Sequence, residues 1–388
     1  MTAGSAPQRR PRVVFLNNEI LPYRIPLFQA LHERADLESY VLFSTRRSSE
    51  RKWRIVPGEL GFPHRILPGI CLHPPKAHLS EKRSIYINPT LIAELARLRP
   101  DVVVAYEFSV PSMTALLYAR ITGRPLLIWS ECTGITDRHL TRDQRWARRV
   151  LIPRAQGFFG TSLMACRNLV ALGAPPERVT EAPQVHQVKW IMGQADRFRG
   201  MSEAPGETVL YVGSLIERKG VGLLLRAFAR ASANRPSIRL RIVGSGPLKN
   251  QLTEQVRRLG LQKRVAFSGF IQPADIPREY ARADLFVLPS LEDTFAVVVV
   301  EAMACGIPVI CSPYAGVTAY MKDGRDAFIV DPNDTDLLAQ RITQALDDRS
   351  LRARFVERGR NIAMRFEARS VAEVFAGEIL RTAGRKTA

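Results

Sequence analysis

The chain reads SLEDTFAVVVVEAMACGIP over residues 290–308. Asp293 precedes Glu301 by eight positions in this stretch, and small residues form a turn between the two acids. Glu301 opens an apolar, alanine-rich segment that ends in Gly-Ile-Pro, where glycine and proline indicate the end of a helix. Short apolar runs at Leu285–Leu288 and Pro308–Ile310 flank the stretch. It therefore predicts a strand, a helix and a second strand in succession.

The same alternation of strand and helix patterns continues along the chain and is typical of parallel α/β sheets. The other expected strands are Val13–Leu16, Ser39–Phe43, Val102–Ala105, Pro125–Trp129, Gly157–Gly160, Val179–Ala182, Val209–Val212, Arg239–Val243 and Val265–Phe267. The expected helices are Ile25–His32, Pro89–Leu98, Val110–Thr122, Asp143–Ala155, Gly220–Ala231 and one that Asp334 caps. Residues 45–84, rich in Arg, Ser, Pro and Gly, form the least regular segment.

Two consecutive α/β units of similar size predict two Rossmann-like domains that face each other across a central cleft. Residues 1–190 form the N-terminal domain in this interpretation, and residues 191–365 form the C-terminal domain. The polar, glycine-containing segment 192–207 suits a linker. Residues 366–388 are expected to form a final amphipathic helix that crosses back to the N-terminal domain.

The chain of 388 residues carries a net charge of +19. Residues 1–190 hold 27 Lys and Arg against 15 Asp and Glu, so the excess leans towards the N-terminal half. Such a balance favours nucleic acid, an anionic membrane surface or phosphate-bearing substrates as partners. No zinc-finger spacing, RNP-like aromatic motif or basic tail supports nucleic acid. A plainer interpretation places the arginines on solvated faces.

The five cysteines are scattered, show no CxxC spacing and are expected to be reduced. No run of about 18 apolar residues is present. The first twelve residues, MTAGSAPQRRPR, lack the apolar segment of a signal peptide. We therefore expect a cytoplasmic protein.

Residues 211–220, YVGSLIERKG, follow an expected strand and precede an expected helix. Gly213 permits close backbone approach to a ligand. Arg218 and Lys219 can bind phosphate oxygens, arginine with two bonds and lysine as a point charge. The loop Thr294–Val297 and the helix after it present backbone amides to the same anion. Taken alone, the basic turn is equally well explained as a solvated surface turn.

Carboxylates and strand-end turns supply the other groups that a nucleotide sugar requires. Glu301 can accept hydrogen bonds from two ribose hydroxyls, although an acid at a helix start is also favoured by the helix dipole alone. Asp293 can bind hexose hydroxyls together with the loop amides of Thr294, Phe295 and Ala296. For the base, the turn FSGFIQ offers backbone groups, and the turn GSGP lets backbone approach a ligand. The residues concerned in these two turns are Gly269, Phe270 and Gly244.

The order of these motifs resembles glycosyltransferase family 4, most strongly over residues 205–350. The resemblance implies the GT-B fold, a nucleoside-diphosphate sugar bound mainly by the C-terminal domain, and transfer with retention of configuration. It also implies no required metal and no cofactor beyond the donor. The sequence departs from the family at Asp293, where glutamate is usual, and at Ser214, where a phosphate-binding arginine is usual. We hypothesise that Arg218 supplies part of the missing charge.

The N-terminal half is expected to bind the acceptor. Its first strand-to-helix loop lies within NNEILPYRIPLF, a pattern that resembles a bacterial polysaccharide-assembly subgroup and implies a glycan or lipid-linked acceptor. Arg24 in this loop can reach the cleft and meet an anion, or it can be a plain surface charge. Glu131 and Glu107 each follow an expected strand, whose carboxyl end points into the crevice of an open α/β sheet. We expect Glu131 first and Glu107 second to lie near the reacting centre.

The expected helix at residues 143–155, DQRWARRVLIPRA, combines Arg145, Arg148 and Arg149 with Trp146. It can lie on an anionic membrane as a peripheral contact, or it can be an ordinary surface helix.

The interpretation that unites these motifs is a metal-independent, retaining glycosyltransferase. Two alternatives remain open from the sequence. One is a GT-B nucleotide-sugar epimerase, and the other is a non-enzymatic basic protein that binds membrane or nucleic acid.

Overall fold

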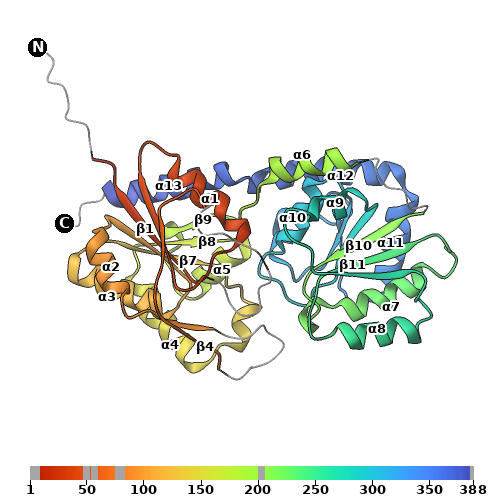
Figure 1. The fold of residues 1–388 in the computed structure, drawn as a ribbon, viewed down its shortest axis with the longest axis horizontal. Helices are drawn as coiled ribbons and strands as arrows, with labels where there is room; N and C mark the ends of the chain where they lie inside the picture. Colours follow the sequence, from red (N-terminus) through yellow and green to blue (C-terminus); the bar gives the residue numbers. More distant parts are fainter. Residues whose placement is uncertain (1–8, 47–52, 54–59, 75–83, 200–205, 385–388) are drawn as a thin grey trace, which may run out of the picture.

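The computed structural model describes residues 9–46, 53, 60–74, 84–199 and 206–384. It contains two α/β domains that lie side by side, each built on a parallel sheet with helices on its faces (Figure 1). The two Rossmann-like domains confirm the expected GT-B architecture. Within the described residues, no helix is both long and apolar enough to cross a bilayer.

The sheet of the N-terminal domain has the order β3-β2-β1-β6-β7-β8-β9, and all its strand pairs are parallel. Its strands are β1 Arg12–Asn17, β2 Glu38–Phe43, β3 His64–Ile66, β6 Val102–Tyr106, β7 Leu126–Ser130, β8 Gly157–Gly160 and β9 Val179–Glu181. A separate antiparallel pair joins β4 Ile70–Leu72 to β5 Ile85–Ile87. The strand order reverses direction between β1 and β6, which is where open α/β sheets form a ligand crevice.

The sheet of the C-terminal domain has the order β12-β11-β10-β13-β14-β15, again with parallel pairs. Its strands are β10 Thr208–Val212, β11 Arg239–Val243, β12 Val265–Gly269, β13 Leu285–Leu288, β14 Val309–Cys311 and β15 Phe328–Ile329. The corresponding reversal lies between β10 and β13. Each of these strands except β12 is a largely buried run rich in Val, Ile and Leu, the composition of strands covered on both faces.

Helices cover both sheets. They are α1 Ile25–His32, α2 Leu91–Leu98, α3 Val110–Thr122, α4 Arg142–Leu151, α5 Leu163–Ala171, α6 Val188–Phe198, α7 Val221–Ala231, α8 Lys249–Arg258, α9 Ile276–Ala281, α10 Val297–Ala304, α11 Thr335–Asp347, α12 Arg349–Ala363 and α13 Ala368–Gly384. The Asp334 side chain accepts a hydrogen bond from the Leu337 amide at 2.9 Å, which confirms it as the cap of α11.

The last helix, α13, packs against the N-terminal domain although the chain reaches it from the C-terminal domain (Figure 1). Its Phe375 ring lies 5.0 Å from Trp129 and 4.3 Å from Phe159, centroid to centroid. The two domains are therefore joined by two chain crossings, one before α6 and one before α13.

One expectation about the linker is wrong in part. Residues 192–198 of the expected linker 192–207 belong to helix α6, and Val188, Ile191 and Ala195 of this helix are buried in the C-terminal core. These positions follow the i, i+3, i+7 spacing of one helix face. The C-terminal domain thus begins near Val188, a few residues before the predicted boundary at residue 191.

Candidate active site

A cavity of about 760 Å³ lies between the two domains. Its walls come from the loops that follow the parallel strands of both sheets, the place expected for ligands in open α/β folds. Among the residues singled out from the sequence, those that line the cavity are Glu131, Gly213, Ser214, Arg218, Lys219, Gly244, Phe270, Asp293, Thr294, Phe295, Ala296, Val297 and Glu301. Three others, Arg24, Glu107 and Gly269, are not among the lining residues.

Lys219 and Asp293 form an ion pair in the C-terminal wall. Asp293 Oδ1 also accepts the backbone amides of Phe295 at 3.3 Å and Ala296 at 3.0 Å. Burial acts to raise the pKa of Asp293, but the charges of Lys219 and Arg218 outweigh it and hold that pKa below its ordinary value. The carboxylate and both amides, which we expected to meet the hexose directly, are thus occupied with one another and shape the loop.

Arg218 is fastened to the same loop by its own backbone. Its carbonyl accepts the amides of Leu291 at 2.7 Å and Glu292 at 3.3 Å, while its Nη1 donates to the Glu292 carbonyl at 3.0 Å. The turn after β10 and the turn after β13 are therefore one rigid unit. This unit holds two cationic side chains, Arg218 and Lys219, on the cavity wall.

The glycine turns pack against one another. A Cβ at Gly244, whose φ is +144°, would lie 1.8 Å from the Gly213 carbonyl oxygen. The Gly213 amide donates to the Val243 carbonyl, and the Gly244 amide donates to the Gly269 carbonyl. Gly244 therefore allows the turn after β11 to pack closely against the turn after β10. As a result, the carboxyl ends of β10, β11 and β12 lie together beneath the cavity.

Glu301 is the fifth residue of α10, not its first, because the helix begins at Val297. The helix dipole therefore does not explain an acid at position 301, because its stabilising effect is confined to the first turn of a helix. Glu301 Oε1 pairs with His186 Nε2 at 2.8 Å, and Oε2 accepts the Tyr280 hydroxyl at 2.7 Å. Burial acts to raise the pKa of Glu301, but the bonds from His186 and Tyr280 lower it below its usual range. Glu301 is thus an ionised group on the cavity wall.

Glu131 lies on the N-terminal wall, directly after β7, and is held by two side chains. Arg24 pairs with its carboxylate, and Gln184 Nε2 donates to the same oxygen. Arg24 is only 1% exposed, bonds Asn17 at 2.7 Å, and lies over the Tyr106 and Trp129 rings. The expectation that Arg24 reaches into the cleft is therefore wrong. Its charge is used to hold Glu131.

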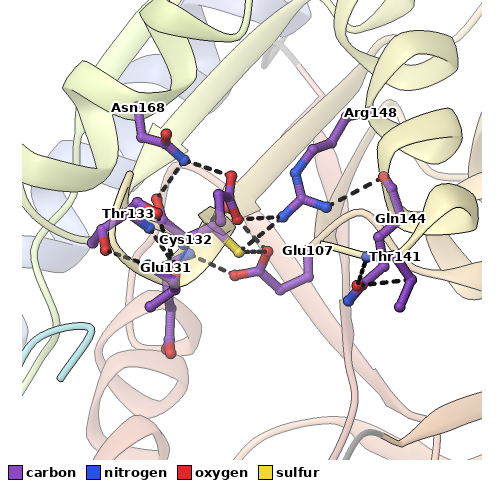
Figure 2. A network of polar contacts seen from close by, with 11 residues as sticks. Glu107, Glu131, Cys132, Thr133, Thr141, Gln144, Arg148 and Asn168 are labelled. Carbon is purple, nitrogen blue, oxygen red and sulfur yellow. Dashed lines mark hydrogen bonds and ion pairs between the residues drawn. The ribbon is translucent and has the colours of Figure 1, made fainter. Parts of the chain in front are cut away.

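Glu107 is joined to Glu131 in a network of polar contacts (Figure 2). Its carboxylate accepts the Glu131 amide at 2.6 Å, the Ser130 hydroxyl at 3.0 Å and the Cys132 thiol at 3.2 Å. Its φ of 59° is uncommon for a residue other than glycine. Burial raises the pKa of Glu107 above its ordinary value. Glu107 thus shapes the backbone that presents Glu131 and does not itself line the cavity.

Arg148 belongs to this buried network and not to the outer surface (Figure 2). Its guanidinium pairs with Asp137 at 2.8 Å and donates to the Cys132 sulfur at 3.2 Å, and the residue is 5% exposed. The expectation that Arg148 shares an exposed basic face with its helix neighbours is therefore wrong. Trp146, by contrast, is 57% exposed.

Several cavity residues were not found from the sequence. They are Pro22, Tyr23, Pro26, Trp53, Gln184, His186, Gln187, Trp190 and Ser245, among others. His186 and Gln184 lie in the crossing between the domains, which carries no motif. Their partners Glu301 and Glu131 are 115 and 53 positions away, so no local pattern indicated the pairs.

Comparison with known proteins connects this site to one family. Residues 194–362 match the family model for glycosyl transferases group 1. The chain is 37% identical over 139 residues to mannosylfructose-phosphate synthase of Agrobacterium fabrum, covering 34% of this chain and 31% of that protein. It is 34% identical to D-inositol 3-phosphate glycosyltransferase of Acidothermus cellulolyticus, covering 52% and 47%. The chain thus spans less than half the length of these relatives.

Solved structures extend the likeness to both domains. The Anabaena protein HepE in complex with UDP has a TM-score of 0.78 at 20% identity, covering 95% of this chain and all of that one. The same protein in complex with UDP-glucose has a TM-score of 0.74 at 20% identity, covering 96% and 100%. At this identity the likeness shows the fold. Residues 194–362 thus match the family model for glycosyl transferases group 1, and the chain as a whole shares the two-domain GT-B fold of these solved structures.

Proposed function

We propose that this chain transfers a sugar from a nucleoside-diphosphate sugar to a hydroxyl group of a glycan or lipid-linked acceptor, with retention of configuration. The observation that supports it most is the cavity between the domains, in which a rigid cationic turn and the ionised Glu301 line one wall. A diphosphate and a ribose require a cation and a hydrogen-bond acceptor of this kind. The solved neighbour with UDP and UDP-glucose provides a precedent for such a ligand on this fold.

The cationic turn is the group we assign to the diphosphate. Negative charge develops on the leaving diphosphate as the bond to the sugar breaks, and groups fixed beforehand stabilise that charge most effectively. Lys219 and Arg218 lie on the wall in such a fixed turn. The first-turn amides of α10 lack intrahelical acceptors and line the same wall at Val297 and Val298, so they can donate to phosphate oxygens.

The remaining groups follow from this placement. Glu301 accepts the ribose hydroxyls through the carboxylate lone pairs that its bonds with His186 and Tyr280 leave available, and the backbone near Phe270 meets the base. In the same-face mechanism that the family resemblance implies, the acceptor oxygen bonds to the anomeric carbon on the side from which the diphosphate departs. The leaving phosphate oxygen takes the acceptor proton, so no enzyme nucleophile is required.

A thermal-shift panel of UDP, GDP, ADP, CDP and dTDP tests donor binding. One of these is expected to raise the unfolding temperature of the wild type, since a ligand at one hundred times its dissociation constant stabilises by about 2.7 kcal/mol. Arg218→Ala is expected to reduce that shift. If no nucleoside diphosphate raised the unfolding temperature, the donor site would be refuted. If Arg218→Ala showed the same rise as the wild type, Arg218 would not contribute to donor binding.

An anionic membrane surface is the second partner that we propose. Helix α4 exposes Arg142, Arg145 and Arg149 together with Trp146, and the adjacent α3 exposes Leu117 and Ile121. Arginines around an exposed indole match an interface of anionic headgroups over acyl chains. Leu117, Ile121 and Trp146 are each more than half exposed.

Liposome sedimentation tests this surface. Wild-type protein is expected to sediment with vesicles containing phosphatidylglycerol and not with pure phosphatidylcholine. Arg145→Glu/Arg149→Glu is expected to abolish binding, at about 1 kcal/mol per lost cation and more for each reversal. The matched control, Arg257→Glu/Arg258→Glu on the outer helix α8, makes the same charge change elsewhere and should leave binding nearly intact. Equal loss in both variants would show a net-charge effect and contradict a specific face.

A further inference from the structure

Both oxygens of the Glu301 carboxylate are held by the protein. Oε1 pairs with His186 Nε2 at 2.8 Å, and Oε2 accepts the Tyr280 hydroxyl at 2.7 Å. The two partners come from different parts of the chain, because Tyr280 belongs to α9 and His186 lies between β9 and α6. A carboxylate that is bonded at both oxygens does not turn freely about its last bond. The carboxyl plane of Glu301 is therefore fixed before a ligand arrives.

These two bonds leave one acceptor direction on each oxygen of Glu301. An ionised carboxylate has about four lone-pair sites, two on each oxygen. His186 and Tyr280 use one apiece. The remaining sites belong to two different oxygens of a carboxylate on the cavity wall. This arrangement matches the two neighbouring hydroxyl groups of a ribose, each donating to a different oxygen.

The pair also fixes the tautomer of His186. Burial acts to raise the pKa of Glu301, but the bonds from His186 and Tyr280 lower it, so the carboxylate is ionised and only accepts hydrogen bonds. The shared hydrogen is therefore on Nε2 of His186. Nδ1 is buried and has no hydrogen-bond partner among the described residues, so no acceptor there draws the hydrogen to the other nitrogen. The imidazole is thus committed to donating to Glu301.

The backbone of His186 is fixed where the two chain crossings meet. Its amide donates to the Phe366 carbonyl at 2.8 Å, and the residue forms an isolated parallel bridge with Glu367. The Glu367 carboxylate in turn accepts the Lys189 amide at 2.9 Å, at the start of α6. His186 is buried and lines the cavity. Its ring is therefore held by the junction of the two crossings, independently of the helix α10 that carries Glu301.

We propose that His186 is a positioning residue for the donor: its Nε2–H holds Oε1 of Glu301 in the direction in which the carboxylate meets both ribose hydroxyls. His186 acts through Glu301 and does not touch the reacting atoms. Without the imidazole, the carboxylate turns about its remaining bond to Tyr280, and ordering it again on binding lowers the affinity. This inference rests on the proposed transferase function and deepens it, because it places part of the ribose selectivity in the crossing between the domains.

Calorimetric titration with matched nucleotides tests this role. The probes are UDP, GDP, ADP and CDP, each with its 2′-deoxy and 3′-deoxy analogue, and the readout is the ratio of the dissociation constants of analogue and parent. For the nucleotide that the wild type binds most tightly, His186→Ala is expected to lower this ratio about tenfold for at least one analogue. That factor corresponds to about 1.4 kcal/mol, slightly less than one hydrogen bond to a charged group. Undiminished binding of the deoxy analogue shows that the variant is folded.

Two amide variants separate positioning from packing. The side-chain nitrogen of glutamine can take the place of Nε2, so His186→Gln should keep the wild-type ratio. Asparagine carries the same amide on a chain one methylene shorter, so His186→Asn should behave as His186→Ala. His32→Ala, at an exposed histidine that ends α1, is the matched control and should behave as wild type. In transfer assays, His186→Ala and His186→Asn should raise KM for the donor and leave kcat nearly unchanged.

The outcomes distinguish this inference from the proposed function. If the wild type discriminates against a deoxy analogue and His186→Ala does so by the same ratio, the positioning role alone is wrong. Equal losses in His186→Gln and His186→Asn would show that the imidazole only fills space, and would also overturn the role. A wild type that binds a nucleotide without discriminating against either analogue would contradict ribose binding by Glu301, and with it this inference. A wild type that binds none of the nucleotides would refute the proposed function itself.

Discussion

Replacing Lys219 with alanine is expected to lower the rate of sugar transfer by about 10²–10³-fold. Lys219 lies on the cavity wall in a turn fixed by the Arg218 backbone, so its ammonium is in place before charge develops on the leaving diphosphate. Its largest effect is therefore expected on kcat. Steady-state release of nucleoside diphosphate, measured over a range of donor concentrations, separates kcat from KM.

The Lys219 experiment needs a control for folding, because Asp293 loses its partner in the variant. Breaking a buried ion pair on one side costs about 3–5 kcal/mol. The double variant Lys219→Gln/Asp293→Asn removes both charges and should fold with less loss while remaining slow. Lys263→Ala, an exposed lysine between α8 and β12, should transfer normally. Wild-type kcat in the folded double variant would exclude Lys219 from charge stabilisation.

Replacing Glu301 with alanine is expected to weaken donor binding by about 10²-fold. Two ribose hydroxyls donate to one carboxylate in the proposed complex, and hydrogen bonds to charged groups contribute about 1.5–3 kcal/mol each. Losing both bonds weakens binding by about 3 kcal/mol, which corresponds to a rise of about 10²-fold in the dissociation constant. Titration with the nucleoside diphosphate selected by the thermal-shift panel measures the dissociation constant directly.

A deoxy ligand isolates the ribose contact. Wild-type protein should bind the ribonucleoside diphosphate more tightly than its 2′-deoxy analogue, and Glu301→Ala should bind the two almost equally. Glu254→Ala on the outer helix α8 serves as the matched acid control and should behave as wild type. If Glu301→Ala still bound the ribonucleoside diphosphate more tightly than its 2′-deoxy analogue, by the wild-type ratio, a group other than Glu301 would bind the ribose hydroxyl.

Most strands of the two parallel sheets and several helices followed from the sequence because their signals are local, whereas the short strands β3, β4, β5 and β15 were not predicted. Buried runs such as Leu285–Leu288 are continuous and apolar, and the helix Val110–Thr122 is flanked by two capping residues, Ser109 and Gly123. Helix α6 was missed because Gly193 and polar neighbours resemble a linker. Its buried face is evident only once the C-terminal core supplies a surface to pack against.

The candidate site was predictable in outline but not in its contacts. Motif order brought Lys219, Asp293 and Glu301 to one cavity, since strand ends of a parallel sheet meet at one edge. The fate of Arg24 was not predictable, because an arginine in a loop is usually exposed. Its burial depends on Glu131, which is 107 positions away, and on two aromatic rings.

The start of α10 shows the same limit at shorter range. The acid at position 301 suggested a helix start, but the chain turns earlier, at Ala296, whose φ is 73°. Alanine has no preference for that conformation. The hydrogen bonds from the Phe295 and Ala296 amides to Asp293 hold the turn, so tertiary contacts override the local pattern.

The measurement that tests the central claim most directly is product analysis with a panel of nucleoside-diphosphate sugars, with and without a hexoside acceptor. The account predicts that one donor gives a new glycoside, with the anomeric configuration of the donor retained, and an equal amount of nucleoside diphosphate. Both products should depend on the acceptor and fall together in Lys219→Ala and Glu301→Ala. Conversion of the donor to an isomeric nucleotide sugar without acceptor would instead show an epimerase. No turnover of any donor that binds would contradict the transferase account.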